Sequence, residues 1–133
     1  MVSGIYINMS ISNLERSMEF FTGLGFTFNP QFTNDHGACL IVSPTISVML
    51  VHKEKFEELA KRPVAPRDSA EMLLSLQCET VEEVRRIAET AFSLGGKQVN
   101  EFEDHGFMQS WAFEDLDGHL WDLFCFDPNQ LPK

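Results

Sequence analysis

The feature that most constrains the fold of this chain is an order of predicted elements that occurs twice. The pair Leu24-Gly25 ends a helical pattern in the first half, and Leu94-Gly95 ends another in the second half. Each helical pattern follows a strand-like segment and precedes further strand-like segments. Two copies of one unit must bury their apolar faces jointly. We therefore expect a duplicated fold rather than two unrelated halves.

Each copy is predicted to contain one strand, one helix and three further strands. In the first copy the strands fall at residues 5–11, 26–28, 38–42 and 46–51, and Ser12 or Asn13 caps the helix. In the second copy they fall at residues 72–78, 97–102, 107–113 and 120–126, and Thr80 caps the helix. A short charged helix at 53–62 and a proline-containing linker at 62–68 separate the copies.

The length of 133 residues allows one well-filled core but not two ordinary domains. We predict a single domain over residues 1–133, with modules at about 4–62 and 70–127. No apolar run approaches the roughly 20 residues that span a bilayer, and the N-terminus lacks the pattern of a signal peptide. We expect a cytoplasmic protein without membrane contact.

The charge balance and the cysteines exclude several classes of partner and chemistry. Twenty acidic against ten basic residues give a formal charge of −10, which opposes binding to a phosphate backbone, so nucleic acid is not expected as a partner. Cys39, Cys78 and Cys125 lie far apart within apolar stretches and without a Cys-x-x-Cys pair. We expect them to be reduced and buried.

Two motifs resemble those of a known family. Residues 13–26, NLERSMEFFTGLGF, resemble the opening signature of the vicinal-oxygen-chelate superfamily, which includes glyoxalases, bleomycin-resistance proteins and extradiol dioxygenases. Residues 114–122, EDLDGHLWD, resemble its closing strand. The resemblance implies an α+β fold of two βαβββ modules with curled mixed sheets around a central cleft, and a homodimer. It also implies a small-molecule ligand.

The metal enzymes of this superfamily hold a divalent ion on four side chains, and the resemblance places these positions at Tyr6, Met49, Leu73 and Asp122. Only Asp122 is a conventional ligand for the ions that such enzymes use. We therefore expect no metal and no other cofactor. The four histidines, which are predicted to lie exposed in turns or at strand ends, suggest no alternative metal site: His36, His52, His105 and His119.

Alternation along the strands assigns the residues of the expected cleft. The ligand-binding candidates are Tyr6, Asn8, Met49, Leu73, Ser75, Gln77, Ser110, Asp122 and Phe124, accompanied by Ser10, Ser47, Val51, Ala112 and Leu120. The opposite faces, expected to pack under the helices, carry Ile5, Ile7, Val48, Leu50, Leu74, Leu76, Phe113, Trp121 and Leu123, and Trp111 is also expected in the core.

This lining is mostly apolar with one carboxylate, and it suits a flat, aromatic or cationic ligand. Asp122 and Tyr6 are the candidate catalytic pair, as acid or base across the cleft, and the alternative is a structural hydrogen bond between strands. Two functions remain open, and the sequence does not decide whether the protein is an enzyme. One is a protein that binds a small molecule without the usual metal; the other is a lyase, isomerase or dioxygenase with an altered metal site. A third possibility is a dimer that binds another protein.

Overall fold

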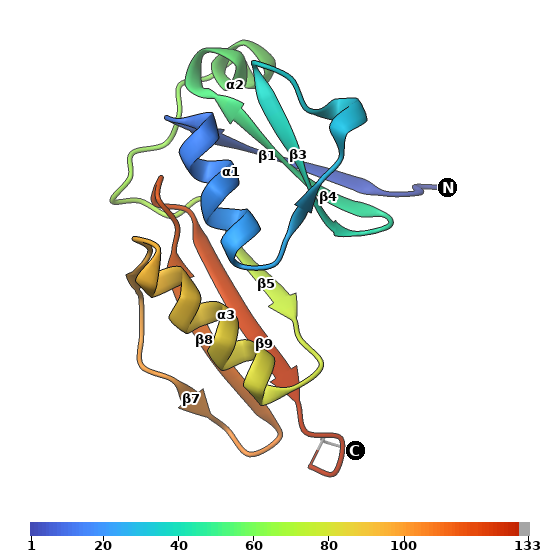
Figure 1. Ribbon diagram of the computed structural model, residues 1–133, viewed down its shortest axis with the longest axis vertical. Helices are drawn as coiled ribbons and strands as arrows, with labels where there is room; N and C mark the ends of the chain where they lie inside the picture. Colours follow the sequence, from blue (N-terminus) through green and yellow to red (C-terminus); the bar gives the residue numbers. More distant parts are fainter. Residues whose placement is uncertain (131–133) are drawn as a thin grey trace. The chain divides into compact units, whose positions relative to one another are not determined.

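The structure is a computed structural model that describes residues 1–130. Within them the chain forms an α+β fold with two mixed sheets, one of four and one of five strands (Figure 1). The chain divides into two compact units at Pro66 and Arg67, within the segment predicted as a linker. Each unit consists of one sheet with a long helix packed on one face.

The first unit contains a sheet of order β1-β4-β3-β2, in which β1 and β4 are parallel and the other pairs are antiparallel. Its elements are β1 (Ile5–Ile11), α1 (Leu14–Gly23), β2 (Thr27–Phe28), the 3-10 helix η1 (Pro30–Phe32), β3 (Gly37–Ser43), β4 (Ile46–His52) and α2 (Lys53–Ala60). The βαβββ order predicted for this half is confirmed. The 3-10 helix was not predicted, although its signals, an Asn29 cap and Pro30 at the first position, stand in the sequence.

Side chains alternate across the first sheet as the period-two pattern predicts. Ile7 pairs with Val48, and Met9 pairs with Leu50, on the face that α1 covers. The prediction that Ile5 packs inward is wrong, because its side chain is 50% exposed. Ile5 and its ladder partner Ile46 form the last pair of the parallel ladder, at the N-terminal ends of both strands, and both remain exposed there.

Local hydrogen bonds fix the ends of the two long helices. Asn13 caps α1 by accepting a hydrogen bond from the backbone N–H of Arg16, and Thr80 caps the corresponding helix of the second unit in the same way. Gly25 and Gly95 follow the two helices with φ of 104° and 105°, a left-handed conformation that favours glycine. The repeated helix stop that the sequence predicts is therefore repeated in the backbone.

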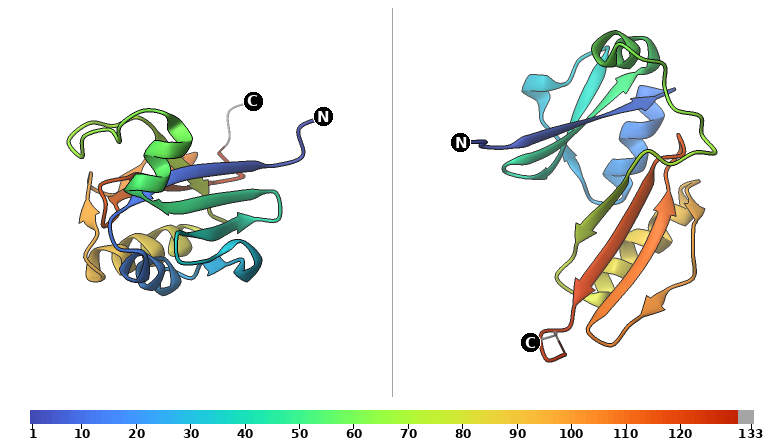
Figure 2. Two further views of the ribbon diagram at one scale, coloured as in Figure 1. Left: turned by 90° about the horizontal axis from the view of Figure 1, so that it is seen from above. Right: turned by 180° about the vertical axis from the view of Figure 1, so that it is seen from behind.

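The second unit contains a sheet of order β5-β9-β8-β6, with β7 paired to β8. Figure 2 (right) shows this sheet in front of its helix. The elements are β5 (Leu73–Gln77), α3 (Val81–Ser93), β6 (Lys97–Gln98), β7 (Glu103–Asp104), β8 (Met108–Glu114) and β9 (Leu120–Phe126).

The prediction of one strand over residues 97–102 is wrong in extent. The strand β6 ends at Gln98, and a separate strand, β7, pairs with β8 further along. The reason lies in Asn100. Its side-chain Oδ1 accepts a hydrogen bond from the N–H of Ala112, and its carbonyl oxygen accepts one from the indole of Trp111. These bonds replace the regular ladder bonds, and the chain bulges away from β8 between the two short strands.

The core of the second unit lies between α3 and the sheet. Phe113, Trp121 and Leu123 are fully buried, as predicted. Trp111 is half-buried, between Phe92 of α3 and Phe102, at ring-centroid distances of 5.2 and 5.8 Å. Edge-to-face packing of this kind joins the helix to the bulged segment.

The three cysteines are buried free thiols, as predicted: Cys39, Cys78 and Cys125. Among the helices of residues 1–130, none is both long and apolar enough to cross a membrane.

Candidate functional site

The candidate site of the second unit is the sheet face opposite α3, which we call the polar face. The ladder places Ser75 beside Asp122, and Asp122 beside Ala112. The next row contains Gln77, Phe124 and Ser110. Residues directly opposite each other in a ladder project from the same side of a sheet. The structure thus brings together, on one face, the six candidates predicted in this unit: Leu73, Ser75, Gln77, Ser110, Asp122 and Phe124.

Asp122 is the central charged group of the polar face. The hydroxyl of Ser75 donates a hydrogen bond of 3.2 Å to its Oδ2. Partial burial raises the pKa of Asp122 above its usual value, and the nearby Glu103 carboxylate raises it further, whereas the Ser75 bond opposes the shift. The carboxyl group of Asp122 is therefore less acidic than that of an exposed aspartate.

No basic residue of the three central strands neutralises the carboxylate of Asp122. The residues of β5, β8 and β9 include no lysine or arginine. In the row next to Asp122, the Nε of Arg67 lies 3.1 Å from Oε1 of Glu114, so that this carboxylate already has a cationic partner. Glu103 contacts His105 at 3.3 Å. The polar face is consequently acidic at its centre.

The three candidates of the first unit also share one sheet face. Tyr6 lies beside Ser47 in the ladder, and Asn8 lies beside Met49, so that all four side chains project from the side opposite to Ile7 and Val48. Tyr6 is 59% exposed. Tyr6 and Asp122 belong to different units, and their cooperation across a cleft stays a prediction.

At the four positions that the resemblance assigns to the metal, Tyr6, Met49, Leu73 and Asp122, the side chains offer few donor atoms that suit a divalent ion. Leu73 has no donor atom, and the Met49 thioether is a soft ligand that the hard or borderline ions of such enzymes do not favour. Asp122 alone offers a carboxylate. Within residues 1–130, no three His, Cys, Asp or Glu side chains come together in a way that could hold a metal ion.

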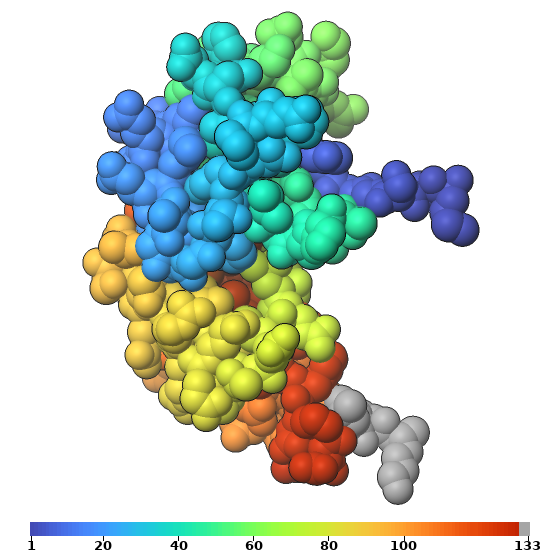
Figure 3. Space-filling view, turned by 45° about the vertical axis from the view of Figure 1, so that its right-hand side comes forward, coloured from blue at the N-terminus to red at the C-terminus, as the bar shows by residue number. Residues whose placement is uncertain are grey.

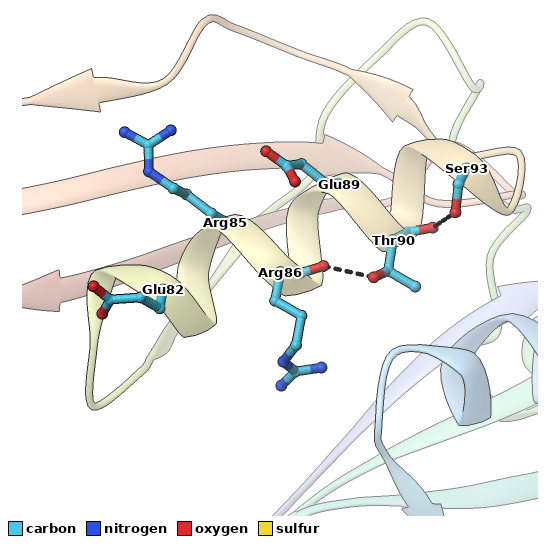
Figure 4. A pocket seen from close by; sticks show the side chains of 6 residues that line it. All are labelled: Glu82, Arg85, Arg86, Glu89, Thr90 and Ser93. Atoms are coloured by element: carbon cyan, nitrogen blue, oxygen red, sulfur yellow. Dashed lines mark hydrogen bonds between the residues drawn. The ribbon is translucent and has the colours of Figure 1, made fainter.

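Sequence reasoning did not anticipate an open groove on the outer face of α3. Six residues of this helix line it: Glu82, Arg85, Arg86, Glu89, Thr90 and Ser93 (Figure 4). All lie outside the apolar stripe of the helix, where charged residues ordinarily face solvent. In the space-filling view α3 (yellow) lies at the surface of its unit (Figure 3).

The polar groups of this groove do not converge on one point. Arg85 and Arg86 point in opposite directions (Figure 4), and the guanidinium of Arg85 lies 3.8 Å from the centre of the Phe102 ring. The hydroxyls of Thr90 and Ser93 donate to helix carbonyl oxygens at 2.6 and 2.8 Å. These side chains are satisfied locally, and the polar face of the sheet remains the better candidate site.

Comparison with known families and structures agrees with this fold. The family model described as Glyoxalase/Bleomycin resistance protein/Dioxygenase superfamily matches residues 5–123. Comparison with curated proteins gave no match.

Several solved structures are similar over nearly the whole chain. A hypothetical protein from S. aureus is 24% identical, with 94% of each chain covered and a TM-score of 0.81. A glyoxalase/bleomycin resistance protein/dioxygenase family enzyme from Burkholderia phytofirmans PsJN is 14% identical, with 92% of this chain and 97% of that chain covered and a TM-score of 0.79. The fosfomycin resistance protein FosX from Listeria monocytogenes is 15% identical, with 97% and 98% covered and a TM-score of 0.67. At these identities the likeness establishes the fold alone.

Proposed function

Because this chain belongs to the glyoxalase/bleomycin resistance protein/dioxygenase superfamily, we propose that it binds a small aromatic or cationic molecule on its polar face without the usual metal of that superfamily. The observation that carries the proposal is the position of Asp122, a half-buried carboxylate on a sheet face whose central strands contain no basic residue. A ligand cation at this position would neutralise the carboxylate and form a charge-assisted hydrogen bond.

The neighbours of Asp122 support a ligand with an apolar body. Phe124 and Leu73 lie on the same face, one on each side of the Ser75–Asp122 row. Phe124 is only partly buried and Leu73 is 54% exposed, so both offer apolar surface that a ring could cover. Ser75 and Gln77 add hydrogen-bonding groups along β5. Apolar contact surrounding a few directional polar groups is the usual composition of a small-molecule site.

The alternative function is a lyase, isomerase or dioxygenase with an altered metal site. Its supporting observation is the raised pKa of Asp122, since a carboxyl group that retains its proton more strongly is better suited to act as an acid or base. Metal analysis of the purified protein, with titration of Ni²⁺, Zn²⁺, Mn²⁺ and Fe²⁺, separates the two functions. A stoichiometric ion that is lost in Asp122→Ala would favour the enzyme.

Binding is tested by thermal unfolding in the presence of a panel of aromatic ammonium compounds and of their neutral analogues. A ligand present at 100 times its Kd stabilises the folded protein by about 2.7 kcal/mol. We expect cationic members of the panel to raise the Tm of the unaltered protein. We expect their affinity for Asp122→Asn to fall at least about tenfold, the effect of losing roughly 1.4 kcal/mol.

The matched control is Glu89→Gln, which removes one carboxylate from the outer face of α3 and should leave binding unchanged. If no compound changes the Tm, or if Asp122→Asn binds as tightly as the unaltered protein, the proposal is wrong.

We also propose a homodimer. β1 and β5 stand at the edges of their sheets, and their exposed apolar side chains include Tyr6 and Leu73, at 59% and 54%. An exposed strand edge with apolar side chains favours association. Light scattering during size-exclusion chromatography gives the mass directly, and a monomer at micromolar concentration would contradict the dimer.

A further inference from the structure

Two buried thiols of the second unit occupy neighbouring positions on parallel strands. The ladder between β5 and β9 ends with Gln77 beside Phe124. The N–H of Cys78 donates a hydrogen bond of 2.7 Å to the carbonyl oxygen of Phe124, which extends the ladder by one step. The next pair in this register is Cys78 and Cys125. Neighbouring strands lie about 4.8 Å apart, so that the two Cβ atoms start from adjacent positions.

Both thiols project to the side of the sheet that α3 covers. Cys125 continues the buried row of Trp121 and Leu123 along β9, and it is 2% exposed. Cys78 follows Leu74 and Leu76 on the same side of β5, and it is 5% exposed. Burial raises the pKa of Cys78 most, followed by the nearby Glu83, and the charge of Cys125 also raises it.

The Cys125 thiol has a hydrogen-bond acceptor other than Cys78. The Sγ of Cys125 donates to Oε1 of Gln109 at 3.4 Å. Burial raises the pKa of the Cys78 thiol, and the nearby Glu83, in the first turn of α3, raises it further. Neither thiol donates to the other, and each sulfur keeps lone pairs for a shared ligand.

We infer that Cys78 and Cys125 together form a binding site for a soft monovalent metal ion, with copper(I) as the representative, held between two thiolates. Thiolate ligands select copper(I) over the harder divalent ions. A tetrahedral zinc site needs further ligands, and no group of three or more His, Cys, Asp or Glu in residues 1–130 provides them. Two sulfur atoms without a third strong ligand suit an ion that accepts two-coordinate binding.

Binding proceeds without oxidation. One copper(I) ion forms two Cu–S bonds, the two S–H bonds break, and two protons leave for solvent, so that the site changes from neutral to a net charge of −1. In the free protein the Cys125 thiol donates a hydrogen bond to the Gln109 amide oxygen, and metal binding breaks this bond. Glu79 and Thr80, which follow Cys78 in the loop after β5, are exposed.

The test is an anaerobic titration of the fully reduced protein with copper(I) against a coloured chelator. We expect one ion per chain for the unaltered protein. Cys78→Ser and Cys125→Ser should each bind at least about tenfold more weakly, while Cys39→Ser, which removes the buried thiol of the first unit, should bind as the unaltered protein does. Absence of binding by the unaltered protein, or binding by either site variant as tight as that of the unaltered protein, overturns the inference.

A second measurement does not depend on the folding of variants. X-ray absorption of the unaltered protein, loaded with one equivalent of copper(I), should show two sulfur ligands. A coordination shell with one sulfur, or with nitrogen and oxygen only, contradicts the two-thiolate site. This site lies on the helix-covered side of the sheet, and its test is independent of the ligand proposed for the polar face.

Discussion

The indole Nε1 of Trp121 donates a hydrogen bond of 3.0 Å to Oδ2 of Asp115. The other carboxylate oxygen of Asp115, Oδ1, accepts bonds from the backbone N–H groups of Asp117 and His119 at 2.9 and 3.0 Å. One buried carboxylate therefore ties the turn between β8 and β9 to the tryptophan beneath α3. Because successive side chains of a strand point to opposite faces, this contact also directs Asp122 to the polar face.

Replacing Asp115 with asparagine should destabilise the fold. The Asn amide can accept the two backbone bonds through its oxygen, but its NH₂ group would then face the N–H of Trp121, and a buried donor would lose its acceptor. We expect a loss of about 1–3 kcal/mol in the free energy of unfolding, measured with urea. The control Asp68→Asn removes an exposed carboxylate and should change stability by no more than about 0.5 kcal/mol. A similar effect of both variants would contradict this role of Asp115.

The stability difference between the unaltered protein and Asp115→Asn should depend on pH. Burial raises the pKa of Asp115 above its usual value of 3.8, and the folded state therefore holds this proton more tightly than the unfolded state does. The resulting stabilisation is complete below the unfolded pKa and is lost as the pH rises through the folded pKa. The destabilisation by Asp115→Asn should accordingly be larger at pH 4 than at pH 7 in urea unfolding. A difference that grows with pH would mean that the pKa is lowered instead.

Ser75→Ala should raise the pKa of Asp122 further. The hydrogen bond from the Ser75 hydroxyl stabilises the charged carboxylate and partly offsets the effect of burial. Titration of the Asp122 carboxyl carbon by NMR measures the shift directly. Ser93→Ala, on the outer face of α3, is the matched control and should leave the titration unchanged. An unchanged pKa in Ser75→Ala would show that the bond does not act on the charged form.

Gly118→Ala should destabilise the second unit. Gly118 has φ of 90°, and an added Cβ would lie 2.6 Å from Cγ of Arg67. Strain of this kind costs about 1–3 kcal/mol, and moving Arg67 away would also disturb its bonds to Glu114 and the carbonyl oxygen of Leu116. Urea unfolding measures the loss. Gly23→Ala, at the last helical position of α1, should be neutral or slightly stabilising, and equal effects of the two variants would exclude the strain.

The thiol of Cys78 should be almost inert in the folded protein. Burial, followed by the nearby Glu83, raises its pKa from 9.0 to about 12, which lowers the thiolate fraction at pH 8 by about a thousandfold. Alkylation with iodoacetamide, followed by peptide mapping, should show that Cys78 reacts at least about that much more slowly in native protein than in urea. Native reaction within tenfold of the denatured rate would contradict the raised pKa.

Most of the fold followed from local patterns in the sequence. Period-two alternation assigned Ile7 and Val48 to one face and Tyr6 and Ser47 to the other, because the pleat of a strand fixes the direction of each side chain. The caps at Asn13 and Thr80 were also predictable, since a side-chain oxygen that bonds the first turn requires only nearby residues. The extent of the strand after Lys97 was not, because Asn100 takes its partners from β8, which follows later in the chain.

Part of the candidate site could likewise be predicted from the sequence, and part of it could not. The sequence by itself determined, from the alternation of side chains along each strand, that Ser75 and Asp122 belong to the same sheet face. It also determined that Asp122 is the one conventional metal ligand among the four positions that the resemblance assigns to the metal. Only the tertiary structure decided that these two side chains are ladder neighbours joined by a hydrogen bond, that burial alters the pKa of Asp122, and that Cys78 stands beside Cys125. The physical reason is that alternation is a local property of each strand, whereas register and burial arise when strands distant in sequence pair and a helix covers them.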